Sequence, residues 1–155
     1  MSEIKRRDVL LPTPAPKGRG LLPDLLGYNL RRAQVALFQD FAAATAEHDV
    51  TPGQFGVLVP IDATPGLNQT ELGDAMGVDR STVVAAIDRL QKRNLVERRP
   101  VPGDRRSHAL HLTAQGQQLL TRMVPAVRAH ETQFSGHLTE AERRQLIALL
   151  KKLAG

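Results

Sequence analysis

A short basic segment of the chain concentrates the residue types that bind phosphate. Between Asp79 and Arg106 lie eight arginine and lysine residues and four acids, so this segment holds +4 of the +5 net charge of the 155-residue chain. Guanidinium and ammonium groups pair with phosphate, and arginine also pairs with the edge of guanine. None of the five aromatic residues lies in the segment, which argues against binding of single strands by base stacking.

The first part of this segment, RSTVVAAIDRLQKR from Arg80 to Arg93, is suited to the major groove of duplex DNA. Its small side chains permit close approach to base edges, and its basic residues can reach guanine or backbone phosphate. The candidate contact residues are Arg80, Ser81, Thr82, Ala85, Arg89, Lys92 and Arg93. The alternative is an amphipathic surface helix whose charges meet only solvent.

The second part, PGDRR from Pro102 to Arg106, predicts a strongly charged turn. Arg106 is the candidate for insertion into a minor groove, where the negative potential attracts arginine. Asp104 is expected to orient the Arg106 guanidinium, and Arg105 is expected to lie on phosphate. The alternative is a charged turn that contacts only water.

Capping residues and hydrophobic spacing predict the elements that position the first candidate set. Asn68 and Glu71 form a capping-box pattern, and Gly77 is expected to end the helix that they begin. Asp79 is expected to cap the next helix. The inward-facing residues of that helix are Val83, Ile87 and Leu90. Two short helices around a tight turn are typical of a helix-turn-helix motif.

A basic hairpin is predicted directly after this motif. Asn94 is suited to a left-handed exit from the second helix. Residues 95–99 and 107–112 read as strands, and residues 101–106 as the turn between them. The combination predicts a mainly α fold, a winged helix-turn-helix with a two-stranded β wing.

Long amphipathic helices are predicted on both sides of this lobe. Apolar residues recur at steps of three and four from Leu22 to Ala44 and again from Leu146 to Leu153. Thr113 is expected to cap a helix that runs to about Phe134, and a capping box at residues 139–142 opens the last helix. These helices are long enough to bury their apolar faces against a second chain.

A shorter helix is predicted from Thr51, where a hydroxyl cap precedes a proline. Phe55, Leu58 and Val59 are its expected buried face. Pro60 is expected to kink this helix or end it early.

The first twenty residues hold three prolines and two glycines without sustained periodicity. They are expected to form a flexible basic arm. Two interpretations stay open, because the arm either touches phosphate or is a solvated tail.

The stretch from Thr51 to Gly116 resembles the MarR family, named after the multiple antibiotic resistance regulator. The resemblance rests on TPGQFGVL, on NQTELGDAMGVDRSTVVAAIDRLQKRNLVERR and on PGDRRSHALHLTAQG. Its most specific features are the Asp-x-Arg of the wing, at Asp104 and Arg106, and the spacing from Asp-Arg-Ser-Thr-Val through Arg-Leu to Leu-Thr-x-x-Gly. The sequence departs from the family pattern at Asn94, where glycine is usual, and at Pro60.

The resemblance implies a homodimer whose two winged lobes bind a pseudo-palindromic operator in double-stranded DNA, about one helical turn apart. It divides the chain into an arm at residues 1–20 and a single MarR-like domain at residues 21–155. Within that domain, residues 51–116 form the DNA-binding lobe, and residues 21–50 and 117–155 form the dimerisation helices. Transcriptional repression is the commoner activity in the family.

The resemblance also implies that a small effector releases the DNA. The segment LLGYNLRRAQVALFQDF resembles regulators of aromatic-acid breakdown, some of which respond to acyl-CoA thioesters. Tyr28, Arg31 and Arg32 are the candidates for contact with an aromatic or anionic effector. The alternatives are ordinary helix packing for the tyrosine and solvated or ion-paired arginines.

The sequence gives no support to enzyme chemistry. The chain has no cysteine, which excludes thiolate metal sites and cysteine nucleophiles. His108 and His111 point to opposite faces of a predicted strand and cannot form a metal pair, while His48, His130 and His137 are expected on the surface. Because phosphate loops, nucleophile elbows and HExxH motifs are missing too, we expect no cofactor, metal or catalysis.

The sequence gives no support to membrane insertion either. No apolar run approaches the roughly 20 residues that span a bilayer, and the start lacks the apolar core of a signal peptide, so a cytoplasmic protein is expected. The competing function is a basic interaction module that binds nucleic acid or anionic surfaces without sequence specificity or effector control. The helix-turn-helix punctuation favours the regulator.

Overall fold

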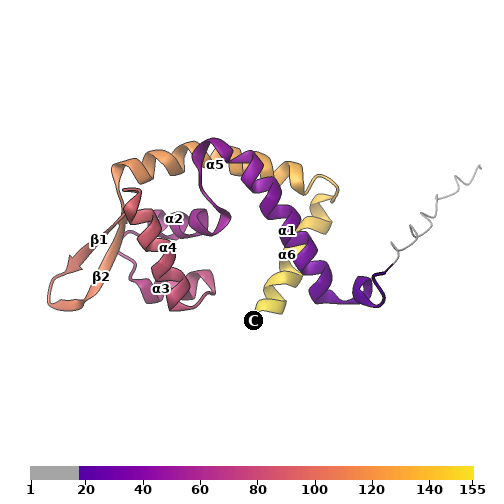
Figure 1. Ribbon diagram of the computed structural model, residues 1–155, viewed down its shortest axis with the longest axis horizontal. Helices are drawn as coiled ribbons and strands as arrows, with labels where there is room; N and C mark the ends of the chain where they lie inside the picture. Colours follow the sequence, from indigo (N-terminus) through magenta and orange to yellow (C-terminus); the bar gives the residue numbers. More distant parts are fainter. Residues whose placement is uncertain (1–17) are drawn as a thin grey trace, which may run out of the picture. The chain divides into compact units, whose positions relative to one another are not determined.

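The computed structural model describes residues 18–155, except for the side chains of residues 104–106. Figure 1 shows the order of the helices and strands along the chain. The chain divides into two compact units, Met1–Ala36 and Leu37–Gly155, each with its own internal contacts.

The described part of the first unit holds a 3-10 turn, η1 (Leu22–Asp24), and the start of helix α1 (Leu26–Ala44). Leu25 between them is extended, so the helix begins at Leu26 rather than at Leu22 as the sequence predicts. Asn29 stabilises this start, because its Nδ2 donates to two carbonyl oxygens of the preceding turn at 2.7 and 2.9 Å.

The second unit contains the predicted winged helix-turn-helix. After α1, its elements are η2 (Ala46–His48), α2 (Pro52–Ala63), α3 (Gln69–Met76), α4 (Arg80–Lys92), β1 (Val96–Val101), β2 (Asp104–Leu112), α5 (Ala114–Phe134) and α6 (Glu140–Ala154). Figure 1 shows β1 and β2 as a hairpin that projects beyond α2, α3 and α4. The predicted mainly helical fold with a two-stranded wing is confirmed.

Side-chain caps start all five helices from α2 to α6. Thr51, Asn68 and Thr139 form capping boxes, in which the cap and the third helical residue exchange hydrogen bonds between side chain and backbone. Asp79 and Thr113 cap α4 and α5 by accepting from one backbone amide each. These bonds satisfy amides that the first helical turn leaves without a partner.

Of the two predicted effects of Pro60, a kink or an early end of α2, the early end is wrong. The helix continues for three more residues and buries Ile61 together with Val57 and Leu58. Val59 is 40% exposed, so its predicted burial is wrong. The buried positions 57, 58 and 61 follow helical spacing, and residue 59 falls outside that stripe.

One hydrophobic core joins α2, α3, α4, the wing and α5. The buried apolar residues are Phe41, Val50, Val57, Leu58, Ile61, Leu72, Val83, Ile87, Leu90, Leu95, Val96, Leu110, Leu112, Leu119, Leu120 and Met123. The predicted inward face of α4 is therefore confirmed. Because both α4 and the base of the wing contribute side chains to this core, their relative position is fixed by packing.

The wing strands are longer, and their turn is shorter, than the sequence predicts. Antiparallel pairing runs from Val96 with Leu112 to Val101 with Asp104, which leaves a turn of two residues. Gly103 in this turn has a φ of 83°, a left-handed value that glycine adopts without a steric penalty. Residues 104–106, predicted as turn, therefore begin strand β2.

A close approach joins the end of α4, the start of β1 and the start of α5. Asn94 has a φ of 55°, as predicted for a left-handed exit. The Thr113 hydroxyl donates to the Asn94 carbonyl (2.6 Å), and the Thr113 amide donates to the Leu95 carbonyl (3.1 Å). A Cβ at Gly116 would overlap the Leu95 carbonyl oxygen, so the approach requires glycine. The Leu-Thr-x-x-Gly sequence therefore has a packing role.

Helix α6 contributes no residue to this core. Its four leucines are between 39% and 56% exposed, namely Leu146, Leu149, Leu150 and Leu153. Full burial of such a side chain contributes roughly 1.5–3 kcal/mol, so this face favours contact with a further apolar surface. Within residues 18–155, no helix is both long and apolar enough to cross a membrane.

Candidate DNA-binding surface

Asp79 organises the first turn of α4. Its Oδ1 accepts hydrogen bonds from the Ser81 hydroxyl and from the Thr82 amide (3.0 Å), and its Oδ2 accepts one from the Thr82 hydroxyl (2.7 Å). These hydrogen bonds hold the pKa of the Asp79 carboxyl well below its usual range. The bond from the Ser81 hydroxyl has the largest effect, and those from Thr82 follow. The carboxylate is therefore ionised at neutral pH and fixes the orientation of both hydroxyl groups.

The exposed face of α4 carries most of the predicted contact residues. The exposed members are Arg80, Ser81, Thr82, Ala85, Arg89 and Lys92. Among the described side chains, no carboxylate forms an ion pair with Arg80, Arg89 or Lys92. Their charges are therefore available to phosphate groups. The other face of the helix is buried in the core.

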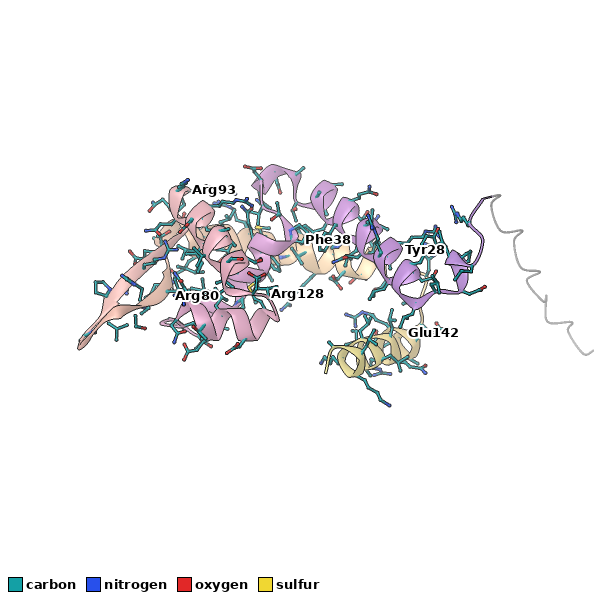
Figure 2. The ribbon with its side chains drawn as sticks, turned by 60° about the horizontal axis from the view of Figure 1, so that its bottom comes forward. Tyr28, Phe38, Arg80, Arg93, Arg128 and Glu142 are labelled. Atoms are coloured by element: carbon teal, nitrogen blue, oxygen red, sulfur yellow. The ribbon has the colours of Figure 1, made fainter. Side chains whose placement is uncertain are left out.

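Arg93, at the other end of α4 from Arg80 (Figure 2), has a different environment. Its guanidinium donates to the carbonyl oxygens of Asp49 (2.5 Å) and His48 (3.3 Å) in the loop before α2. It also lines a hollow of about 510 Å³ together with Arg89 and Lys92. Arg93 therefore joins the end of α4 to the backbone just before α2, which the sequence did not predict.

Arg98 on β1 connects the wing to α4. Its Nη2 lies 2.5 Å from Oδ1 of Asp88, and its Nη1 donates to Oε1 of Gln91. The Arg98 side chain is only 20% exposed. Sequence reasoning missed this residue, because the pairing depends on how the strand packs across the helix.

The three predicted wing-tip contacts, Asp104, Arg105 and Arg106, have side chains outside the described part of the structure. Their backbone forms the start of β2, next to the two-residue turn. The strand register therefore places the backbone of these residues next to the tip of the hairpin. The orientation of the Arg106 guanidinium by Asp104 stays a prediction.

The candidate effector residues lie in the first unit. The Arg32 guanidinium carbon is 5.6 Å from the centre of the Tyr28 ring, a cation–π contact on one face of α1. Arg31 and Arg32 are both exposed. The structure therefore brings two of the three predicted residues together and leaves both guanidinium groups accessible.

The predicted surface location of two histidines is wrong. His130 on α5 is 3% exposed, and its Nδ1 lies 2.8 Å from Oδ2 of Asp40. Its ring packs edge-on against Phe41, with ring centres 5.6 Å apart. The His48 side chain is 9% exposed, whereas His137 is exposed as predicted. No pattern within α5 alone indicates that His130 meets a carboxylate from α1.

Comparisons with known proteins decide the family. The sequence model of the MarR family matches residues 48–107. A Thauera aromatica protein assigned to transcriptional regulation of the hcr operon is 44% identical over 135 residues, which cover 86% of this chain and 81% of the relative. The chain belongs to the MarR family. The MarR resemblance inferred from the sequence is thus confirmed, and the chain is a transcriptional regulator with a winged helix.

Solved structures of MarR-type regulators agree with this assignment. The transcriptional repressor CouR bound to a 23-mer DNA duplex matches with a TM-score of 0.84 and 40% identity, over 91% of this chain and 100% of CouR. CouR bound to p-coumaroyl-CoA matches with a TM-score of 0.82 and 38% identity, over 90% and 98%. The winged lobe described above is therefore similar to that of a regulator solved on duplex DNA.

Proposed function

We propose that this MarR protein is a homodimeric repressor that binds a pseudo-palindromic operator and releases it when a small anionic or aromatic effector binds. The observation that carries this proposal is the exposed face of α4. Small side chains at its first turn lie between Arg80 and Arg89, two arginines without a described carboxylate partner. Such a helix can approach base edges in the major groove while its cations bind phosphate.

The residues of α4 divide by their position along the helix. Ser81, Thr82 and Ala85, in the first two turns, face the base edges. Arg89 and Lys92, toward the other end, neutralise backbone phosphates. Arg93 holds α4 to the segment before α2, because its guanidinium is already bound to the backbone carbonyls of His48 and Asp49.

The wing adds a second contact. Arg106 enters the neighbouring minor groove, Asp104 orients its guanidinium, and Arg105 binds phosphate. The projection of the hairpin beyond the helices supports this placement (Figure 1). The arm at residues 1–20 is a further candidate for phosphate contact.

The homodimer is supported by the uncovered leucine face of α6. A second copy would bury Leu146, Leu149 and Leu150 and offer the same apolar face in return. We assign residues 51–116 to the DNA-binding lobe, and residues 21–50 and 117–155 to dimerisation. The two copies of α4 in the dimer then face the same side of the duplex.

The effector is proposed to be an aromatic acid or its acyl-CoA thioester in a cytoplasmic setting. The similarity to CouR, solved with p-coumaroyl-CoA, supports this class of compound. Arg31 and Arg32 are accessible for an anionic group, and the Tyr28 ring lies beside Arg32.

Binding measured over a salt series tests the proposed function. The probes are a genomic DNA fragment selected by the protein, a scrambled duplex of equal length, and anionic lipid vesicles. We expect tighter binding to the selected fragment, and a slope of roughly −0.9 per phosphate contact when the logarithm of the binding constant is plotted against that of the salt concentration. Equal binding to both duplexes and to the vesicles would instead support the basic interaction module.

A further inference from the structure

The hydrogen bonds of Asp79 fix the polarity of the two hydroxyl groups at the start of α4. An ionised carboxylate has no hydrogen to donate, so it can only accept. The Ser81 hydroxyl donates to Oδ1, and the Thr82 hydroxyl donates to Oδ2 at 2.7 Å. Each hydroxyl has one hydrogen, and Asp79 accepts both of them. What Ser81 and Thr82 present to their surroundings is therefore only the lone pairs of their oxygens.

This polarity determines which bases the two residues can bind. In the major groove the hydrogen-bond donors are the amino groups of adenine and cytosine, whereas guanine and thymine offer acceptors there. We infer that Asp79 makes Ser81 and Thr82 hydrogen-bond acceptors that select adenine or cytosine at the operator positions they face. The inference rests on the proposed function, in which the first turn of α4 meets base edges.

The arrangement around Asp79 is rigid enough to maintain this selection. The Thr82 amide also donates to Oδ1 (3.0 Å), so three donors from the first turn of the helix hold one carboxylate. Turning either hydroxyl outward to donate to a base would leave a carboxylate oxygen without that partner. Arg80 and Arg89 carry only donors, so they complement the hydroxyls by binding guanine or phosphate.

The variant Asp79→Asn tests the inference without removing the helix cap. Asparagine caps helices about as well as aspartate, and the Thr82 amide requires an oxygen at the Oδ1 position. The side-chain NH₂ then replaces Oδ2 and donates to the Thr82 hydroxyl oxygen. The O–H bond of Thr82 must then rotate away from residue 79, and the hydroxyl can donate to guanine or thymine. The variant is expected to change specificity at the base pair that Thr82 faces.

The experiment compares affinities for a selected operator in which each base pair is substituted in turn. Thr82→Val, which removes the hydroxyl at similar volume, identifies the base pair in question. Wild type is expected to prefer the natural adenine or cytosine there over an analogue without the amino group by at least about fivefold. Asp79→Asn is expected to lose or invert that preference, with other positions unchanged. Asp74→Asn, an exposed aspartate on α3, controls for the loss of one negative charge.

The outcomes separate the inference from the proposed function. A wild type without preference at any base pair contradicts sequence-specific binding itself. A wild type that binds the analogue without the amino group as well as the natural base, or an Asp79→Asn variant that keeps the wild-type preference, contradicts the inference alone. If Asp79→Asn does not fold, Thr82→Val and Ser81→Ala decide, because each must remove an adenine or cytosine preference at one position.

Discussion

Gly116 shows how one residue fixes the junction of α4, β1 and α5. A methyl group there would overlap the carbonyl oxygen of Leu95 and lie 3.0 Å from its carbon. We expect Gly116→Ala to reduce the free energy of unfolding by about 1–3 kcal/mol, because backbone must move to make room. Thermal or urea unfolding measures this change.

Gly53 provides the matched control for this substitution. It lies in the first turn of α2, and a Cβ there would have no atom within 4 Å. Gly53→Ala is expected to leave stability unchanged or slightly higher. An equal loss of stability in both variants would contradict the steric role of the Leu95 carbonyl.

Asp79 predicts a pH-dependent contribution to stability. Hydrogen bonds from Ser81 and Thr82 lower its pKa in the folded state below its ordinary value of 3.8. A carboxyl whose pKa is lowered by folding stabilises the fold above its ordinary pKa, and the stabilisation is lost as pH falls through the folded-state pKa. Asp79→Ala should therefore melt at a lower temperature than wild type at pH 7.

The difference in melting temperature between wild type and Asp79→Ala should narrow once the pH falls below 3.8. Differential scanning fluorimetry of both proteins over a pH series measures this difference in melting temperature. A difference that stays constant or widens at low pH would show that the charge of Asp79 does not stabilise the helix start.

At the residue scale, the helix caps could be predicted from the sequence and the buried histidine could not. Asn68, Asp79 and Thr139 cap helices as predicted, because a cap depends on residues within three positions along the chain. His130 was expected on the surface, but it is buried against Asp40, 90 positions away. Long-range partners of this kind leave no local signal in the sequence.

At the element scale, Arg98 holds the wing against α4. We expect Arg98→Ala to weaken operator binding severalfold while the salt slope stays unchanged, since Arg98 contacts Asp88 and Gln91 rather than phosphate. Fluorescence anisotropy with a labelled operator measures both quantities. A smaller salt slope in the variant would instead make Arg98 a phosphate contact.

The partner of Arg98 supplies the control. If the two residues act as a pair, the loss of operator affinity in the double variant Asp88→Ala with Arg98→Ala should differ from the sum of the losses in the two single variants. The effects of substituting residues in contact are not additive. The coupling in stability should stay below about 1 kcal/mol, since Asp88 is 49% exposed. Additive effects would mean that the strand is positioned by the core alone.

The elements themselves could be predicted from the sequence more closely than their limits. The order of helices and strands follows from capping and apolar spacing, and it is correct. The strands were predicted too short because cross-strand hydrogen bonds continue to Val101 and Asp104, past the last alternating residues. Helix α2 passes through Pro60, where local propensity predicts an end and core packing of Ile61 continues the helix.

At the scale of the whole molecule, the leucine face of α6 predicts dependence on a second copy. Leu150→Arg places a charge on that face and is expected to shift the protein to monomers in analytical ultracentrifugation. Ala148→Arg adds the same charge on the opposite side of the helix and should leave the dimer intact. Two variants with the same assembly state would contradict an interface on this face.

In the proposed dimer, α4 reads DNA sequence as one of two symmetry-related helices. The most direct test is a scan of affinity across a selected operator, with every base pair substituted in turn. We expect the sensitive positions to form two symmetric blocks about one helical turn, roughly 10 base pairs, apart, with a loss of about 1–3 kcal/mol in binding free energy per mismatch. Uniform affinity across all substitutions would contradict it and would support binding through charge alone.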